Sequence, residues 1–368
     1  EEVRTGKLVA KHLKSLGLEV QTGIANTGVV GILRGGKPGK VVALRADMDG
    51  LPVEEKVDVP FASKARGKYR GNDVGIMHAC GHDGHTATLL ASAAWLKSVE
   101  DQLPAPVTLL FQPAEEGGHG AKRMIEDGAL NGIDEIYGWH NWPAMPFGKL
   151  ICPDGIVMCG NGTFDITLTG QGGHASQPEL CRDPVLAASA VTMALQQIVS
   201  RHLFPQQAAV VNVSSIEAPS AATVIPDKAV LGGSIRVPDQ KTRDVINRLI
   251  IEISQQTAAS YGVSCEVNIY PRYEATINHG LQAQNVREHW LAEHGQAGME
   301  TETLVPIMAS EDFSYYLNEI PGAFALVGAD DGPAHQSVCH SPFYDFNDQL
   351  IPLVTRLYAR LVGAPLPE

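Results

Sequence analysis

The segment 77–86 holds the densest group of potential metal ligands in the chain. It reads Met-His-Ala-Cys-Gly-His-Asp-Gly-His-Thr and contains three histidines, a cysteine and an aspartate. Zinc, manganese and cobalt accept imidazole, thiolate and carboxylate ligands together. The alternative interpretation is a polar helix start with internally hydrogen-bonded histidines, and it does not explain so many donors in so short a stretch. The segment therefore predicts a metal site.

The ligand types favour a reactive metal over a structural one. A structural zinc site usually consists of four Cys or His ligands in two short pairs. The chain contains no Cys-x-x-Cys pair, and Cys80 has no cysteine close to it in sequence. Carboxylates recur instead at other candidate positions, which suits a site that leaves room for water.

These further candidates follow predicted strands. Apolar strands are expected over residues 41–46, 106–111 and 135–139. The polar residues that follow them are Asp47 and Asp49, Glu115 and Glu116, and His140. Open α/β sheets bind ligands at the carboxyl ends of their strands. We therefore expect these side chains to meet at one edge of a sheet.

The order of the predicted elements indicates two domains. Helical patterns over 3–16, 86–96 and 121–127 alternate with the strands above, as in a largely parallel α/β sheet. After residue 162 the pattern changes to an α+β one, with predicted strands over 163–169, 210–216, 229–237 and 264–270 and helices over 184–201 and 241–261. We expect a discontinuous catalytic domain of residues 1–161 and 273–368 and an inserted, smaller domain of residues 162–272.

Composition excludes some partners. The net charge of −13 and the lack of a basic stripe argue against a nucleic acid partner, and no apolar run is long enough to cross a membrane. Six cysteines in 368 residues do not form a disulfide framework, so we expect a reducing, cytoplasmic location. The chain opens on Glu1-Glu2-Val3-Arg4-Thr5 as if inside a helix, so the lack of a signal peptide is weak evidence for that location.

At this point the chain resembles the M20 metallopeptidase/amidohydrolase family, in the branch of aminoacylases, hippurate hydrolases and auxin-conjugate hydrolases. The matching motifs cover nearly the whole chain and come in the family's order. They are Ala-Asp-Met-Asp-Gly-Leu-Pro (46–52), the cluster at 78–86, Phe-Gln-Pro-Ala-Glu-Glu (111–116), Gly-Gln-Gly-Gly-His-Ala-Ser (170–176), Val-Ile-Pro-Asp (224–227), Ser-Glu-Asp-Phe (310–313) and His-Ser-Pro (340–342).

The resemblance implies a site with two divalent cations (Mn, Zn or Co). The positions that match the family's metal ligands are Cys80, His82, Glu116, His140 and His340. Glu115 then becomes the expected general base, because neighbouring residues of an extended or loop segment point in different directions. Two acids at a helix N-terminus are the alternative interpretation. Asp49 resembles the family's acid that orients a ligand by hydrogen bonding.

The inserted domain carries a second set of candidates. By resemblance, it is a lid that pairs with a second copy, so we expect a homodimer, with a tetramer also compatible. His174 matches a histidine that reaches the neighbouring subunit's site and hydrogen-bonds an oxyanion. Arg236 suits a bidentate hold on a substrate carboxylate, with a surface salt bridge as the alternative. Thr223 stands where many relatives have Asn, which leaves the substrate contacts near the lid open.

The remaining candidates have weaker assignments. Asp47 occupies the position of a metal-binding histidine in distant relatives, and His85 is expected to be a packed polar residue. His78 and Asp83 have no assigned role. The other five cysteines are expected to be small buried hydrophobic residues: Cys152, Cys159, Cys181, Cys265 and Cys339.

The leading functional hypothesis is a metal-dependent amidohydrolase that cleaves a small N-acyl amino acid, such as an N-acetyl or N-benzoyl amino acid. A dipeptidase or carboxypeptidase with the same site is the nearest alternative. A non-catalytic, metal-stabilised binding protein is a third, although no expected ligand or base is missing. A serine nucleophile is disfavoured because the chain has no Gly-x-Ser-x-Gly turn.

Overall fold

The computed structural model describes residues 2–367, which fold into two compact units. The first unit contains the chain up to Val157, the segment Ile277–Val305 and the chain from Asp312 onward. The second unit contains Met158–Thr276 and Pro306–Glu311. The insertion expected from sequence covers residues 162–272. It is therefore shorter at both ends than the second unit of the structure, and it lacks the segment 306–311.

The first unit is built on a mostly parallel sheet. Within residues 2–367 this sheet has seven strands in the order β1-β2-β6-β3-β7-β17-β8. The central strands β6, β3, β7 and β17 are parallel, and the outer strands pair antiparallel. This confirms the predicted α/β class. The strand bounds are β1 Glu19–Ile24, β2 Gly28–Leu33, β3 Val42–Asp47, β6 Val107–Gln112, β7 Glu135–Pro146, β8 Leu150–Ile151 and β17 Gly322–Asp330.

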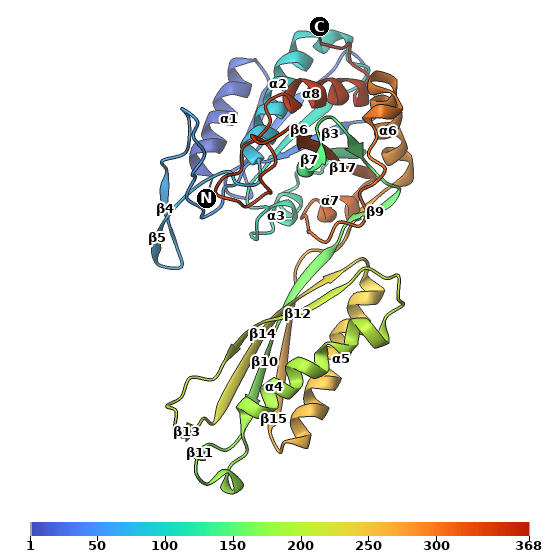
Figure 1. Ribbon diagram of the computed structural model, residues 1–368. Coiled ribbons are helices and arrows are strands. Elements are labelled where there is room, and N and C mark those ends of the chain that lie inside the picture. Colours follow the sequence, from blue (N-terminus) through green and yellow to red (C-terminus); the bar gives the residue numbers. More distant parts are fainter. Residues whose placement is uncertain (1, 368) are drawn as a thin grey trace. The chain divides into compact units, whose positions relative to one another are not determined.

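Helices cover both faces of this sheet (Figure 1). One layer contains α1, α2, α8 and α6, which contact one another in that order, and α3 and α7 pack together on the other side. Because both faces are covered, every residue of β3 and β6 is buried. The helix bounds are α1 Val3–Ser15, α2 His82–Ser98, α3 Gly120–Glu126, α6 Gly280–His294, α7 Ser314–Glu319 and α8 Leu350–Leu361.

The sequence prediction placed the start of α2 at residue 86, which is wrong. The helix begins at His82, directly after Gly81, whose φ of 87° is left-handed. Glycine adopts this conformation without steric cost, so the chain can turn sharply from the loop into the helix. As a result, His82 and His85 lie in the first turns of α2 and are buried.

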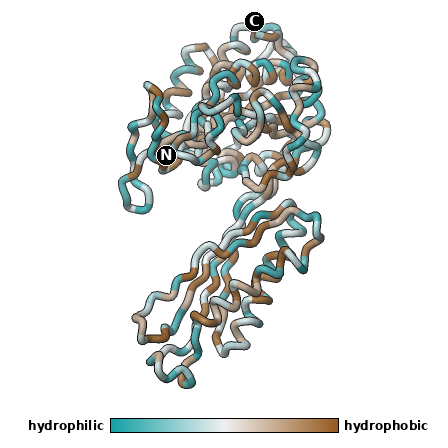
Figure 2. The backbone as a smooth tube through the Cα atoms, viewed as in Figure 1, coloured by the Kyte–Doolittle hydropathy of each residue, from teal (hydrophilic) through white to brown (hydrophobic). Residues whose placement is uncertain are grey.

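The second unit is an antiparallel sheet packed against two helices. Its strand order is β12-β14-β10-β15, and buried residues alternate with more exposed ones along β14. Figure 2 shows that the strands of this unit contain both hydrophobic and hydrophilic residues. Asp183 and Asp239 accept hydrogen bonds from the first-turn amides of α4 and α5, respectively, which begins each helix. The bounds are β10 Gly160–Thr169, β12 Val210–Glu217, β14 Lys228–Val237, β15 Ser264–Pro271, α4 Pro184–Leu195 and α5 Gln240–Ser260.

The helix expected over 184–201 ends earlier, at Leu195, and a short π-helical turn follows at Ile198–His202. The remaining short strands are β4 Arg66–Tyr69, β5 Asn72–Gly75, β9 Gly155–Met158, β11 Gly173–His174, β13 Val224–Ile225 and β16 Thr276–Asn278. Among residues 2–367, every helix is too short or too polar to span a lipid bilayer.

Candidate metal centre

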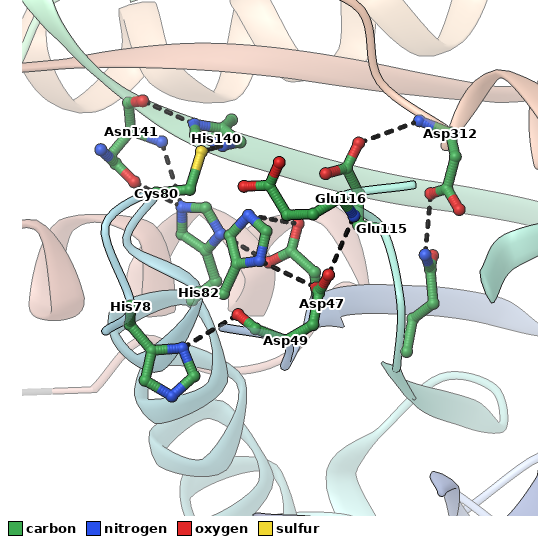
Figure 3. Close-up of polar contacts among 12 residues, drawn as sticks. Asp47, Asp49, His78, Cys80, His82, Glu115, Glu116, His140, Asn141 and Asp312 are labelled. Atoms are coloured by element: carbon green, nitrogen blue, oxygen red, sulfur yellow. Dashed lines mark hydrogen bonds and ion pairs between the residues drawn. The ribbon is translucent and has the colours of Figure 1, made fainter. Parts of the chain in front are cut away.

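The first unit brings the five predicted ligands together. The ligand atoms of Cys80, His82 and His140 lie within 4.8 Å of one another, and so do those of Cys80, Glu116 and His340. Cys80 belongs to both groups, as a ligand shared by two cations would. Figure 3 shows four of these side chains converging: Cys80 from the loop before α2, His82 from the first residue of α2, Glu116 from the segment after β6 and His140 from β7.

His82 is oriented as a metal ligand. Its Nδ1–H donates to Oδ1 of Asp49 at 3.0 Å, which leaves Nε2 as the atom that points into the cluster. This buried Nε2 has no hydrogen-bond partner among the described residues. A buried polar atom without a partner is costly unless something binds it. A histidine that donates one ring nitrogen to a carboxylate and turns the other to a cation is the usual arrangement at metal sites.

His140 has the same arrangement with a different partner. Its Nδ1–H donates to the carbonyl oxygen of Asn141 at 2.6 Å, and its Nε2 lies 3.4 Å from Sγ of Cys80. Burial and the neighbouring His85 hold the pKa of His140 well below its ordinary value of 6.5. The ring is therefore neutral near pH 7, as a ligand must be.

The sequence prediction that His140 follows a strand is wrong. β7 continues to Pro146, and His140 lies inside it, opposite Leu326 of β17. The pairing of β7 with β3 ends at Tyr137. β7 therefore extends beyond β3, and this extension carries His140 to the cluster. The residue reaches the expected sheet edge because β7 is longer than its neighbour.

The two glutamates at the end of β6 differ in their contacts. Oε1 of Glu116 lies 3.1 Å from Nε2 of His340, and its backbone amide donates to Oδ2 of Asp49 at 2.9 Å. Glu115 is buried, and its Oε1 accepts a hydrogen bond from the backbone amide of Asp312 at 3.3 Å. Asp49 thus holds both His82 and Glu116, while Glu115 stands beside the cluster in a separate hydrogen bond.

A buried charged network lies behind these ligands. Arg45 donates to Oε1 of Gln112 at 2.9 Å, to Asp47 at 2.6 Å and to Asp312 at 3.2 Å, and all three ionic side chains are fully buried. Burial alone would raise the pKa of Asp47, but Arg45, His82 and His85 outweigh it and hold that pKa well below 3.8. Asp47 therefore stays ionised.

His85 links this network to the cluster. Its Nδ1 lies 2.7 Å from Oδ1 of Asp47 and its Nε2 2.7 Å from Oδ1 of Asn141. His85 is therefore the packed polar residue that the sequence predicted. Sequence reasoning assigned no role to Arg45, Asn141 or Asp312. The signal for Arg45 was a cation within the apolar strand 41–46, because a buried charge requires a partner.

Other predicted residues lie outside the cluster. His78 is half-buried and hydrogen-bonds the backbone oxygen of Asp49, while Asp83 is exposed. His174 and Arg236 belong to the second unit, where His174 is exposed and bonds Ser176. Arg236 is half-buried on β14 and has no carboxylate partner among residues 2–367. A surface salt bridge is therefore not its role within one chain.

The donor set and its geometry fit two divalent cations. Buried imidazole nitrogens, one thiol and one carboxylate converge, and the atoms behind the ligands fix their orientation. A model of the family described as Peptidase family M20/M25/M40 matches residues 43–364. The chain belongs to this family.

The M20 relatives of this chain cover nearly its full length. An IAA-amino acid hydrolase of Arabidopsis thaliana is 38% identical over 375 residues, which span 100% of this chain and 82% of the relative. The hippurate hydrolase of Campylobacter jejuni is 38% identical over 366 residues, which span 98% of this chain and 91% of the relative. These names belong to the branch that the sequence motifs indicated.

A solved structure agrees with the fold. A Bacillus subtilis protein described as a dinuclear metal-binding peptidase of the M20 family superposes with a TM-score of 0.82 and 30% identity. The match covers 98% of this chain and 92% of that chain. The predicted family is thereby confirmed, and this chain has candidate metal-binding groups of its own.

Proposed function

We propose that this M20 protein is a metal-dependent amidohydrolase that cleaves the amide bond of a small N-acyl amino acid. The observation that carries the proposal is the convergence of the five ligands with Glu115 buried beside them. The names of two relatives, an IAA-amino acid hydrolase and a hippurate hydrolase, support this substrate class. Two divalent cations (Mn, Zn or Co), when bound at this centre, would polarise the carbonyl of the substrate amide and lower the pKa of the attacking water.

The chain's own residues then position the reaction. Glu115 accepts the proton of the attacking water and passes it to the leaving nitrogen, so that the amine departs neutral. The amide of Asp312 holds the carboxylate of Glu115 in place. Cys80, His82, Glu116, His140 and His340 hold the cations, and Asp49 fixes the orientation of His82 and Glu116.

The test of this proposal is the substitution Glu115→Gln. The amide has nearly the same shape but cannot accept the proton, so turnover should fall at least 10²–10⁴-fold. Metal content should stay at about two ions per chain, because Glu115 is not among the proposed ligands. The exposed Glu126, changed to Gln, is the matched control. Turnover retained in Glu115→Gln would refute the assignment.

The substrate class is tested by a panel of amides. The proposed class is represented by hippurate, N-acetyl amino acids and indole-3-acetyl amino acids. Unblocked dipeptides represent the peptidase alternative, which is favoured by the description of the structural neighbour as a peptidase. The proposal expects at least a tenfold higher kcat/KM on the N-acyl compounds, about 1.4 kcal/mol in transition-state binding. Higher values on dipeptides would establish the peptidase alternative. Metal binding without hydrolysis of any compound would indicate a scaffold.

Arg236 is proposed to bind the substrate carboxylate. Burial and the neighbouring Arg272 lower the pKa of Arg236, and no carboxylate among residues 2–367 neutralises it. A guanidinium in this setting is suited to a carboxylate from outside the chain. Replacement by Lys keeps the charge and loses the paired hydrogen bonds, so KM should rise. An unchanged KM would exclude this role.

We also propose that two copies pair through the second unit. On α4, Leu186 and Met193 are 55% and 73% exposed, and Ile216 is exposed on β12, which lies at an edge of the four-stranded sheet. An apolar helix face beside an unpaired strand edge is suited to a second copy of the same surface. Replacement of both Leu186 and Met193 by Asp should yield monomers in light scattering. A tetramer remains a compatible outcome for the parent.

In that dimer, His174 is proposed to serve the partner's site as an oxyanion donor. Mixing His174→Ala chains with Glu115→Gln chains tests this directly. Half of the dimers formed at random are mixed, and each mixed dimer has one complete site, so about one quarter of the parent activity should return. No recovery on mixing would show that His174 acts within its own chain or not at all. The cytoplasmic location stays a prediction.

A further inference from the structure

Two cysteines far apart in sequence meet at the edge of the metal centre. Cys80 lies in the loop before α2, and Cys339 directly precedes the proposed ligand His340. The backbone amide of His340 donates to the carbonyl oxygen of Ala79 at 2.7 Å, so the peptide group after Cys339 is bonded to the peptide group before Cys80. Cys339 and Cys265 are half-buried, so the sequence prediction of small buried hydrophobic residues is wrong for these two and confirmed in burial for Cys152, Cys159 and Cys181.

We infer that Cys80 and Cys339 form a reversible disulfide, and that the oxidised chain cannot hold its metal ions. The existence of the disulfide is independent of the proposed function, but its effect on metal binding depends on the proposed role of Cys80.

The backbone around both cysteines is held in the position that a disulfide requires. A disulfide forms only between cysteines whose Cα atoms lie within about 7 Å. The 2.7 Å backbone bond between His340 and Ala79 joins the peptide groups next to the two cysteines, and this brings their Cα atoms close to that limit. His340 has a left-handed φ of 70°, a conformation that is uncommon for residues other than glycine.

Asn141 supports both segments. Its Nδ2 donates to the hydroxyl of Tyr344 at 2.8 Å and lies 4.0 Å from Sγ of Cys339. On the other side, a Cβ at Gly81 would lie 2.3 Å from Oδ1 of the same asparagine, so only glycine lets the loop approach this closely. Asn141 thus lies against the segments of both cysteines.

An oxidant can reach the pair from one side. Cys80 is buried, whereas Cys339 is half-buried between Val338 and His340, which are both exposed. With a peroxide as the oxidant, the sulfur of Cys339 attacks one peroxide oxygen, becomes a sulfenic acid and releases one water. The thiol of Cys80 then attacks that sulfur and gives up its proton, the S–S bond forms as the S–O bond breaks, and the hydroxide leaves with that proton as the second water. Two electrons pass from the two sulfurs to the peroxide.

The remaining cysteines have no such partner in the part of the chain that the structure describes. Cys152, Cys159 and Cys181 are buried, and their sulfurs contact the carbonyl of Phe324, the sulfur of Met308 and the carbonyl of Gln177, respectively. Cys265 is half-buried on β15, like Cys339 in exposure but without a second thiol beside it. Cys265 is therefore the matched control.

The disulfide removes a ligand that both metal groups share. Cys80 belongs to both candidate ligand sets, and a metal is bound by the thiolate form of cysteine. A sulfur in a disulfide carries no negative charge and has its second bond to Cys339. Oxidation therefore weakens both metal positions at once, and bound metal in turn shields Cys80 from oxidation.

Thiol counting on metal-free protein tests the inference. Hydrogen peroxide should reduce the thiols titrated in denaturant from six to four, because two of the six cysteines are consumed. Peptide mapping without reductant should find the peptides of Cys80 and Cys339 joined, and dithiothreitol should restore six. Metal binding measured by chelator competition should be lost on oxidation and return on reduction. Prior metal loading should slow thiol loss at least about tenfold.

The variants make the result specific. Cys339→Ser has five thiols and should keep all five, whereas the control Cys265→Ser should fall from five to three. Six thiols retained by the parent, equal thiol loss in Cys339→Ser, or a different joined pair would overturn the inference. If Cys339→Ser does not fold, the peptide map of the parent decides. Thiol counts do not depend on turnover, so failed amide hydrolysis refutes only the proposed function.

Discussion

Asp49 offers a sharp test of how the metal ligands are positioned. One carboxylate oxygen accepts from Nδ1 of His82 at 3.0 Å, and the other accepts from the amide of Glu116 at 2.9 Å. Replacement by Asn keeps the shape and one oxygen but puts an NH₂ group in place of the other. This group faces either the ring N–H of His82 or the amide N–H of Glu116, so one hydrogen bond is lost.

The expected loss is calculated from that one bond. A hydrogen bond to a charged group contributes about 1.5–3 kcal/mol, and about 1.4 kcal/mol corresponds to a tenfold change in affinity. If His82 moves its proton to Nε2 to accept from the new NH₂ group, the nitrogen that faces the cluster can no longer bind a cation. Either way, metal affinity should fall about 10–100-fold, the usual effect of removing a partner behind a ligand.

The assay is a titration of metal-free protein with Mn²⁺ or Zn²⁺ against a coloured chelator of known affinity. The matched control is Asp58→Asn, which removes the same charge at an exposed position of the same unit. The control should bind metal as the parent does. If Asp49→Asn binds metal within about twofold of the parent, the carboxylate does not orient the ligands and the reasoning is refuted.

Three further predictions concern stability and local geometry. Arg45→Met leaves two buried carboxylates without their cation and should cost about 3–5 kcal/mol in the free energy of unfolding. The free energy of unfolding is measured by tryptophan fluorescence in urea, because all four tryptophans lie in the first unit. A loss below about 1 kcal/mol would contradict the prediction. Burial raises the pKa of Glu293, but its hydrogen bonds to Arg356 and Arg360 outweigh burial and lower that pKa below 4.5. The stabilisation is therefore present above pH 4.5 and is lost as the pH falls through the folded-state pKa. The difference in melting temperature between the parent and Glu293→Gln should shrink at acid pH. A difference that stays constant with pH would exclude this stabilising role of Glu293. Gly81→Ala puts a Cβ 2.3 Å from Asn141 at a left-handed φ and should reduce metal content measured by mass spectrometry, whereas parental content would show that the loop can shift freely.

The local pattern of the sequence was enough to predict the class of fold and the chemical type of the site. Apolar runs bounded by polar residues predicted β3 and β6, and both strands end where Asp47 and the Glu115 segment begin. These predictions succeeded because strand burial and strand ends depend mainly on nearby residues. The candidate metal ligands were identified from the order of the family motifs, and this order can be read from a single sequence.

Contacts between distant segments were beyond local patterns. The ion pair of Arg45 with Asp312 and the backbone hydrogen bond between His340 and Ala79 join segments that lie far apart in the chain. The length of β7, which places His140 inside a strand, depends on its register with β17, an element formed much later in the sequence. Periodicity contains no information on these pairings.

The sequence by itself determined that a cluster of imidazole, thiol and carboxylate groups must lie at the edge of an α/β sheet, because residue type and strand position decide that. Only the tertiary structure decided which atoms point at the cluster. Asp49 turns Nε2 of His82 inward, and the carbonyl of Asn141 does the same for His140. The physical reason is that a ring's orientation is set by the hydrogen bond on its far side, and that partner is supplied by the fold.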